Sequence, residues 1–205
     1  WTAQVPTMDA KPSRPAGGRR DLTKAQNRET ILAAARQVFG QLGFAAATVR
    51  DVIRATPLAS GTFYNYFKSK EEVYQALRDE TALAVRPRLR AARTGAAGAE
   101  EFLAASFRAF FGFVAETRRD PSPSAERVRM DSPEVLAGFA ELEEDIAAAM
   151  TRGILPAADA GLLSAALTGV AFELAERVKA GADVEEMAGF ATALFMGGMT
   201  ALPAR

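Results

Sequence analysis

The stretch that decides the fold is residues 60–77, with the sequence SGTFYNYFKSKEEVYQAL. Its first half predicts a short helix, because Phe63 and Phe67 lie four residues apart and can face a core together while polar side chains occupy the outer faces. Its second half opens with a capping box at residues 69–72, in which the Ser and Glu side chains bond the first backbone N–H groups of a new helix. We therefore expect a short helix, a Lys-Ser-Lys joint and a longer helix that begins at Lys70.

The composition favours an all-α protein that lacks the commonest catalytic side chains. The 205 residues are 49% hydrophobic and 24% charged, with no Cys and no His. This length allows one or two domains, and many of the apolar residues are alanine, which favours helix. Without Cys and His the chain has no thiolate nucleophile, no imidazole base and no thiolate or imidazole metal ligand. We expect no cofactor, no metal site and no catalytic residues.

Charge is unevenly distributed along a chain whose net charge is zero. Residues 1–70 contain 11 Lys and Arg against 4 Asp and Glu, whereas residues 71–205 contain 14 against 21. A basic N-terminal part indicates a surface that meets a polyanion, although an uneven solvated surface would have the same charges. The most apolar window, around residues 188–202, is flanked by acids and interrupted by glycines, so no membrane span or membrane partner is expected. A cytoplasmic protein is predicted.

The first part of the chain predicts three helices in a characteristic order. Residues 1–22 are basic and rich in Pro and Gly, which is typical of a flexible arm. An amphipathic helix is expected from Thr23 to Gly43, and Thr48 should cap a second, short helix. Pro57 then requires a turn before the helix at residues 60–67. Three helices of this order match a helix-turn-helix domain, and a small helical cap on a bundle is the alternative.

Three segments carry a resemblance to a known family. Gly43-Phe44, residues 48–53 (TVRDVI) and residues 60–72 (SGTFYNYFKSKEE) resemble the N-terminal domain of tetracycline-repressor-type (TetR family) transcriptional regulators. The resemblance implies a DNA-binding domain at residues 23–69 with its recognition helix at about residues 60–67. The turn departs from the family's usual Ala-Gly-Val-Ser, because proline cannot adopt a positive φ and Ala59 has no hydroxyl to cap the next helix.

The resemblance and the side-chain chemistry together give a candidate DNA-binding set. Its hydroxyl, phenol and ammonium groups can bind phosphates, with help from the N-terminal dipole of the second helix. Its single guanidinium matches the O6 and N7 acceptors of guanine, its short polar side chains can read base edges, and its glycine allows close approach. The candidates are Thr48, Arg50, Ser60, Gly61, Thr62, Tyr64, Asn65, Tyr66 and Lys70.

Residues 70–205 are expected to form a helical effector-binding and dimerisation domain. Helical patterns run from Lys70 to the Pro87 region, over residues 99–117 and over about residues 133–154, with a loop at residues 117–133. The resemblance implies a ligand pocket between these helices, and an aromatic lining predicts an apolar or aromatic small-molecule effector, although periodic aromatic residues also form ordinary cores. The candidate ligand-binding residues are Phe107, Phe111, Met130, Phe139, Phe172 and Arg177.

The last two helices are predicted at about residues 159–180 and 183–202, as an antiparallel pair joined at Gly181. We expect apolar residues of the two helices to face each other, including Leu162 and Ala166 on one and Phe190 and Leu194 on the other. This hairpin has more apolar faces than a single partner needs, and its small residues allow another helix to approach closely. A homodimer through these helices, as in the family, is therefore predicted.

The sequence thus predicts a dimeric, ligand-responsive transcriptional regulator, most often a repressor, that binds a near-palindromic double-stranded DNA operator. One alternative is a helical-bundle enzyme that uses the carboxylates of Glu141, Glu143, Glu144 and Asp145. These acids spread around a helix and lack the Glu-x-x-His pattern of di-iron bundles, which favours a solvated acidic face. Another is a dimeric small-molecule binder without DNA recognition, suggested by the altered turn at Pro57 and Ala59.

Overall fold

The computed structural model describes residues 18–117, 132–199 and 201, and over these residues it is entirely helical, without strands. The predicted all-α fold is therefore confirmed. The helices, in chain order, are α1 (Gly18–Leu42), α2 (Val49–Arg54), α3 (Ser60–Tyr64), α4 (Lys70–Thr94), α5 (Ala99–Thr117), α6 (Pro133–Thr151), α7 (Ala160–Lys179) and α8 (Val184–Met199).

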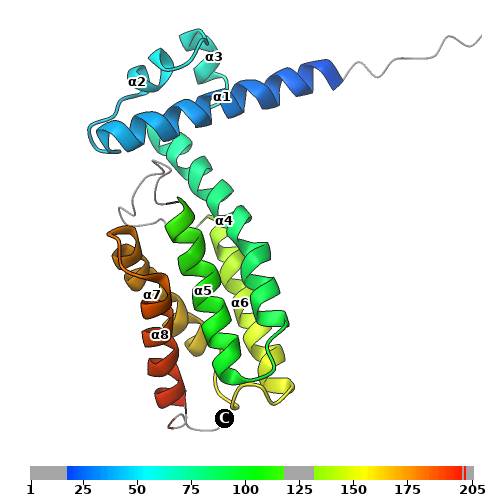
Figure 1. Ribbon diagram of the computed structural model, residues 1–205. Coiled ribbons are helices and arrows are strands. Elements are labelled where there is room, and N and C mark those ends of the chain that lie inside the picture. The colour runs from blue at the N-terminus through cyan, green and yellow to red at the C-terminus, as the bar shows by residue number, and fades with distance from the viewer. Residues whose placement is uncertain (1–17, 118–131, 200, 202–205) are drawn as a thin grey trace, which may run out of the picture.

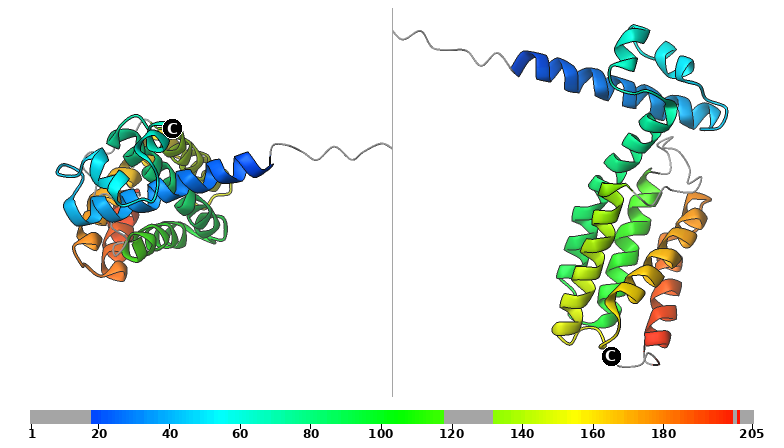
Figure 2. Two further views of the ribbon diagram at one scale, coloured as in Figure 1. Left: turned by 90° about the horizontal axis from the view of Figure 1, so that it is seen from above. Right: turned by 180° about the vertical axis from the view of Figure 1, so that it is seen from behind.

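Two parts of the molecule are joined by α4 (Figure 1). The head, residues 18–69, contains α1 to α3 and lies beyond one end of the body, residues 70–199. The body is a bundle in which α4 packs against α5 and α6, and α5 packs against α7 and α8. The views from above and from behind show α1 lying across the end of the bundle and projecting to one side (Figure 2). Because the start of α4 packs in the core of the head while the rest of α4 packs in the body, a change in the body can reach the head through this helix.

The core of the head explains the apolar pattern of its sequence. Ile31, Leu32 and Phe39 of α1 are fully or almost fully buried, as are Phe63 of α3 and Phe67 just after it. The start of α4 completes this cluster, so the helix begins inside the head. The predicted packing of Phe63 and Phe67 in a core is therefore confirmed. Consequently α3 is fixed by its buried face, and its other faces are free to meet a partner.

Several helix limits differ from those predicted. Helix α1 begins at Gly18 rather than Thr23, with Asp21 in its first turn where a carboxylate interacts favourably with the helix dipole. Helix α4 continues through Pro87 to Thr94. Pro87 lacks the N–H that would bond the Leu83 carbonyl, but both residues are exposed, so water can satisfy that carbonyl. The recognition helix is shorter than expected and ends at Tyr64, followed by a helical turn.

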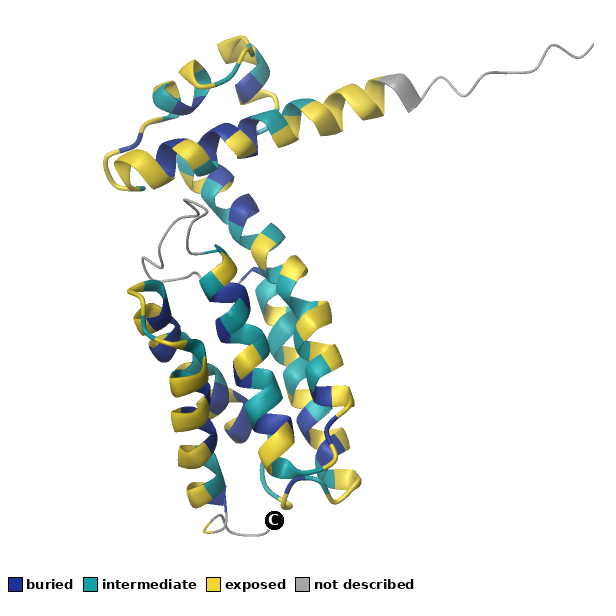
Figure 3. Ribbon diagram, viewed as in Figure 1, coloured by how far each residue is buried: buried dark blue, intermediate teal, exposed yellow. Residues whose placement is uncertain are grey.

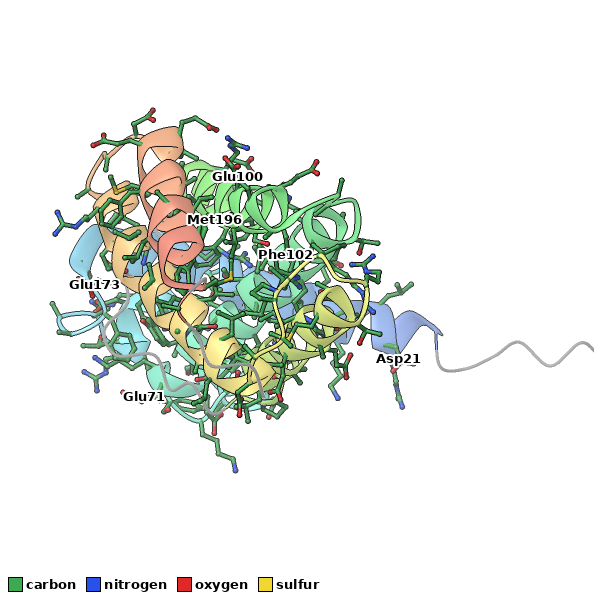
Figure 4. All side chains as sticks on the ribbon, turned by 90° about the horizontal axis from the view of Figure 1, so that it is seen from below. Asp21, Glu71, Glu100, Phe102, Glu173 and Met196 are labelled. Carbon is green, nitrogen blue, oxygen red and sulfur yellow. The ribbon has the colours of Figure 1, made fainter. Side chains whose placement is uncertain are left out.

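The body has its own core, built from the facing sides of α5 to α8. Coloured by burial, the ribbon is dark along these inner faces and yellow along the outer faces (Figure 3). Seen from below, Phe102 lies among the helices, whereas Glu100 and Glu173 lie toward the periphery (Figure 4). No helix in the described part of the chain is both long enough and apolar enough to span a bilayer.

The predicted antiparallel pair α7 and α8 is present, with Gly181 at φ 113° in the connection. The predicted facing residues were partly wrong. Leu162, Phe190 and Leu194 are 66%, 58% and 51% exposed, and Ala166 is exposed as well. The reason is that α8 packs mainly on α5 rather than on α7, and this contact rotates part of each predicted inner face outward.

Candidate DNA-binding surface and effector cavity

Helix α2 begins with a complete capping box. The Asp51 backbone N–H donates to the Thr48 hydroxyl oxygen at 3.3 Å, and the Thr48 backbone N–H donates to the Asp51 carboxylate at 2.9 Å. The Thr48 hydroxyl also donates to this carboxylate at 2.6 Å, so its hydrogen is already used and is not free for a phosphate. The hydrogen bonds from the side chain and backbone of Thr48 hold the pKa of the Asp51 carboxyl below its usual value of 3.8. The box fixes where α2 starts and therefore where Arg50 lies.

The turn between α2 and α3 is built without glycine. The Thr56 hydroxyl donates to the Ile53 carbonyl at 2.9 Å and accepts from the Leu58 N–H at 3.2 Å, on either side of Pro57. Ala59, which precedes α3, has extended backbone angles and provides no side-chain cap, as the sequence predicted. A threonine hydroxyl thus stabilises the turn in place of the positive-φ residue that a glycine would supply.

The predicted DNA-binding residues do not all have the same surroundings. Exposed positions on α2 and α3 and beside them hold Thr48, Arg50, Ser60, Gly61, Tyr64 and Asn65. Tyr64 is 56% exposed, and its ring meets the ring of the buried Phe63 edge-on. This contact orients the Tyr64 ring, which remains accessible. Thr62 and Tyr66 are half-buried, and Tyr66 packs against the head core. Contact with DNA by these residues stays a prediction.

The Lys70 ammonium is directed at backbone carbonyls of the head. Its ammonium donates to the carbonyl oxygens of Phe44, Ala45 and Ala47 at 2.8, 3.2 and 3.0 Å, and it lies 4.6 Å from the centre of the Phe44 ring. An ammonium has three hydrogens, and all three are directed to the loop between α1 and α2. We therefore interpret Lys70 as a brace that ties this loop to the start of α4, rather than as a phosphate contact.

Contacts between α4 and the head continue one turn further along. The Tyr74 ring lies 4.5 Å from the Phe44 ring and 6.2 Å from the Phe39 ring, measured between centroids. On the other side of α4, Glu80 accepts from Arg28 at 3.0 Å and also from Arg36 of α1. The first three turns of α4 are thus attached to α1 by both aromatic and ionic contacts.

The body contains a cavity of about 420 Å³ between α4, α5, α6 and α7. Its lining is mainly apolar and includes Phe107, Phe110, Phe139 and Phe172. The Phe172 ring meets Phe110 and Phe139 edge-on at 5.6 and 6.3 Å, so aromatic side chains of three helices form one wall. The volume lies within the range of ~300–1,000 Å³ that is usual for small-molecule sites.

Three of the six predicted ligand-binding residues line this cavity: Phe107, Phe139 and Phe172. Phe111 is fully buried in the core and stacks on Phe107 instead of reaching the cavity, and Arg177 is exposed on α7 away from the lining. Met130 lies outside the described residues. Tertiary packing sets how α5 and α7 are rotated about their own axes. That rotation decides which residues of each helix face the cavity and which face the core or solvent.

Residues of α4 that line the cavity were missed by the sequence analysis. Arg78, Ala82, Val85, Leu89 and Arg93 recur at spacings of three and four, which is a single helix face. That periodicity was available in the sequence. The arginines obscured it, because charged residues in an amphipathic pattern are normally assigned to the solvent side.

Two ion pairs connect α4 to α6 across the cavity wall. Arg86 binds Glu141 through both Nε, at 3.1 Å, and a terminal nitrogen, and Arg93 Nε donates to Asp145 at 2.7 Å. The hydrogen bond from Arg86 holds the pKa of the Glu141 carboxyl below its usual value of 4.5. Glu143 and Glu144, the other members of the acidic run, are exposed. The run is therefore divided between ion pairs and solvent and does not converge on one site.

Comparison with known proteins agrees with the geometry of the head. The family profile described as bacterial regulatory proteins, tetR family, matches residues 31–77, which extend from α1 through the helix-turn-helix into α4. Residues 31–77 are therefore similar to the N-terminal domain of TetR-family regulators. Over 56 residues it is 39% identical to the HTH-type transcriptional regulator UidR of Escherichia coli K12 and 41% identical to the HTH-type transcriptional repressor KstR2 of Mycolicibacterium smegmatis. These matches cover 27% of this chain and 29% and 27% of those proteins.

Solved structures extend the likeness beyond the TetR-type head to the fold of most of the chain. The fatty acid degradation regulator FadR from Bacillus halodurans has a TM-score of 0.68 at 23% identity, covering 84% of this chain and 96% of that one. FadR from Bacillus subtilis, solved in complex with stearoyl-CoA, has a TM-score of 0.66 at 22% identity, covering 83% and 98%. At these identities the likeness shows the shared fold of head and body.

Proposed function

We propose that the protein is a dimeric transcriptional repressor that releases its DNA operator when a small apolar effector occupies the body. The observation that carries the proposal is the outward-facing pair α2 and α3, held on a TetR-type head whose connection to α4 is braced by Lys70. Such a pair matches the geometry in which one helix crosses the DNA backbone and the next enters the major groove. The repressor name of the relative KstR2 supports this direction of regulation. A chromosomal DNA partner would place the protein in the cytoplasm.

Dimerisation is proposed to occur through the outer faces of α7 and α8. Leu162, Phe190 and Leu194 are large apolar side chains that remain exposed on these helices. A side chain added at Gly169, Gly189, Gly197 or Gly198 would meet no atom of the described residues within 4 Å beyond its own stretch of helix, so these positions leave room for another helix. Two copies related by a two-fold axis would bury this face and present two heads to successive major grooves.

The effector is proposed to bind in the cavity of the body. The cavity is lined by the aromatic side chains of α5, α6 and α7, and α4 forms the wall that continues into the head. An effector that favours one position of α4 over another would shift the population of head positions and so change DNA affinity. The Bacillus subtilis FadR complex with stearoyl-CoA supports an elongated apolar ligand for this fold. We assign no catalytic role, since Glu141 and Asp145 are held in ion pairs.

Footprinting on the DNA that flanks the protein's own gene tests this function. We expect protection of two half-sites about 10–10.5 base pairs apart, centre to centre, or a multiple of that spacing. A scrambled duplex of the same length and composition is the control. Equal affinity for the two duplexes at moderate salt would refute the regulator. If the same sample bound an apolar ligand, that result would leave a small-molecule binder without DNA recognition.

A further inference from the structure

Three arginines of α4 line the cavity, and they differ in how their charge is compensated. Arg86 is paired with Glu141, and Arg93 is paired with Asp145. Arg78 has no carboxylate partner and no hydrogen-bond acceptor among the described residues, and its Nε is shielded from solvent. The central carbon of its guanidinium lies 5.8 Å from the centre of the Tyr74 ring. Arg78 is therefore an uncompensated cation in the wall of an apolar cavity.

This arrangement is unfavourable unless an acceptor arrives. A buried N–H without an acceptor loses its hydrogen bond to water and gains none, and the loss is larger for a charged group. The cation–π contact with Tyr74 returns only part of this loss. The two paired arginines of the same helix show how α4 is neutralised where α6 supplies carboxylates. At Arg78 the described chain supplies none.

Nearby acids on α4 are already engaged. Asp79 accepts from Gln75 at 2.8 Å, and Glu80 is bound by two arginines of α1. Lys179, at the end of α7, also lines the cavity, and its ammonium pairs with Glu176 at 2.6 Å. Glu134, at the start of α6, lines the cavity as well and interacts electrostatically with Arg86, so among the described lining residues Arg78 is the cation that has no carboxylate partner.

We propose that the effector is an amphiphilic acid whose carboxylate binds Arg78 and whose apolar chain lies along the phenylalanines of the cavity. A carboxylate can accept two parallel N–H bonds from the planar guanidinium, and such charge-assisted bonds are among the strongest in proteins. The remaining lining, which is mostly apolar, suits a hydrocarbon or aromatic chain. This inference rests on the proposed effector role of the cavity and names the chemical class of the ligand.

The position of Arg78 also connects the acid group to the head. Arg78 contacts Tyr74, and Tyr74 packs on Phe44, whose carbonyl accepts from Lys70. A carboxylate on Arg78 thus lies two side chains away from the loop that positions α2. An uncharged ligand in the same cavity would lack this contact. The acid group is accordingly the part of the effector that can influence the head, whereas the apolar chain only fills the cavity.

Isothermal titration with a matched pair of probes, dodecanoate and 1-dodecanol, both below their aggregation limits, tests the proposal. The wild-type protein should bind dodecanoate about ten- to a hundredfold more tightly than dodecanol, which is the usual effect of a charge-assisted hydrogen bond. Arg78→Gln should abolish this preference while leaving the dodecanol affinity within about threefold. Arg78→Lys, which keeps the charge but loses the fork, should retain part of the preference. Arg152→Gln, an exposed change at the end of α6 outside the cavity, removes the same charge and should behave as wild type.

Equal affinity of the wild type for the two probes, or failure to bind dodecanoate, would overturn the proposal. Survival of the acid preference in Arg78→Gln would do the same, provided that circular dichroism shows the variant to be folded. Operator binding measured on the same wild-type sample separates the two hypotheses. Specific DNA binding without an acid preference removes only the Arg78 proposal, whereas an acid preference without specific DNA binding removes only the regulator.

Discussion

The role of Lys70 gives the sharpest prediction, because the two interpretations of this residue lead to opposite results. The substitution Lys70→Met removes the ammonium and keeps the apolar stem. Two of its three hydrogen bonds, to Phe44 and Ala47, are partly buried and are worth about 1 kcal/mol each. The bond to Ala45 is exposed and contributes less, and the contact with the Phe44 ring adds about 0.5–1 kcal/mol. We expect the free energy of unfolding to fall by about 2–3 kcal/mol.

Urea unfolding followed by circular dichroism measures this loss. Lys68→Met is the matched control, since the exposed Lys68 lies two residues away and its removal should change the free energy by less than about 0.5 kcal/mol. The salt dependence of operator binding provides the second readout. As a brace, Lys70 contributes no phosphate contact, so the slope of log affinity against log salt should not change in Lys70→Met. Unchanged urea stability together with a slope reduced by about one would refute the brace and restore the phosphate contact.

Three further changes test other parts of the molecule. Arg50→Ala should weaken operator binding about five- to a hundredfold with little effect on random DNA, in anisotropy titrations with Arg54→Ala as control. Leu194→Asp should raise the dimer dissociation constant at least about a hundredfold, because a two-fold interface loses the side chain twice. Leu136→Asp, at an exposed position of α6, should leave this constant unchanged, and sedimentation velocity measures both. Because the folded state lowers the pKa of Glu141, its ionised carboxylate stabilises the fold at pH values above its usual pKa of 4.5. This stability is lost as the pH falls through the folded-state pKa. Glu141→Gln should therefore flatten the acid side of a plot of melting temperature against pH.

Caps and periodicity in the sequence were sufficient for much of the fold. Ala99–Thr117 coincides with the expected helix, and the starts of α2 after Thr48 and of α4 at Lys70 follow from their caps. These features depend on hydrogen bonds and side-chain spacing within a few residues. The continuation of α4 past Pro87 was missed, because proline usually ends a helix and only an exposed carbonyl at this position makes it tolerable.

The candidate sites were harder to predict, since residue type indicates chemistry but not surroundings. Six of the nine predicted DNA-binding residues are exposed on or beside α2 and α3, and their contact with DNA stays a prediction. Phe111 shows the limit in the body, because its neighbour in the same stripe, Phe107, lines the cavity while Phe111 is fully buried. The two rings differ only by the rotation of α5 against its partners, which no local pattern encodes.

By itself the sequence determined the helices, their caps and the helix-turn-helix signature, because these depend on interactions within a few residues of the chain. Only the tertiary structure decided the surroundings of Lys70, Arg78 and Leu194. Lys70 meets carbonyls 23–26 residues away, Arg78 finds no acceptor on the helices around it, and Leu194 faces outward because α8 packs on α5. Each outcome depends on how a helix is rotated about its own axis, and that rotation is set by packing against helices distant in the chain.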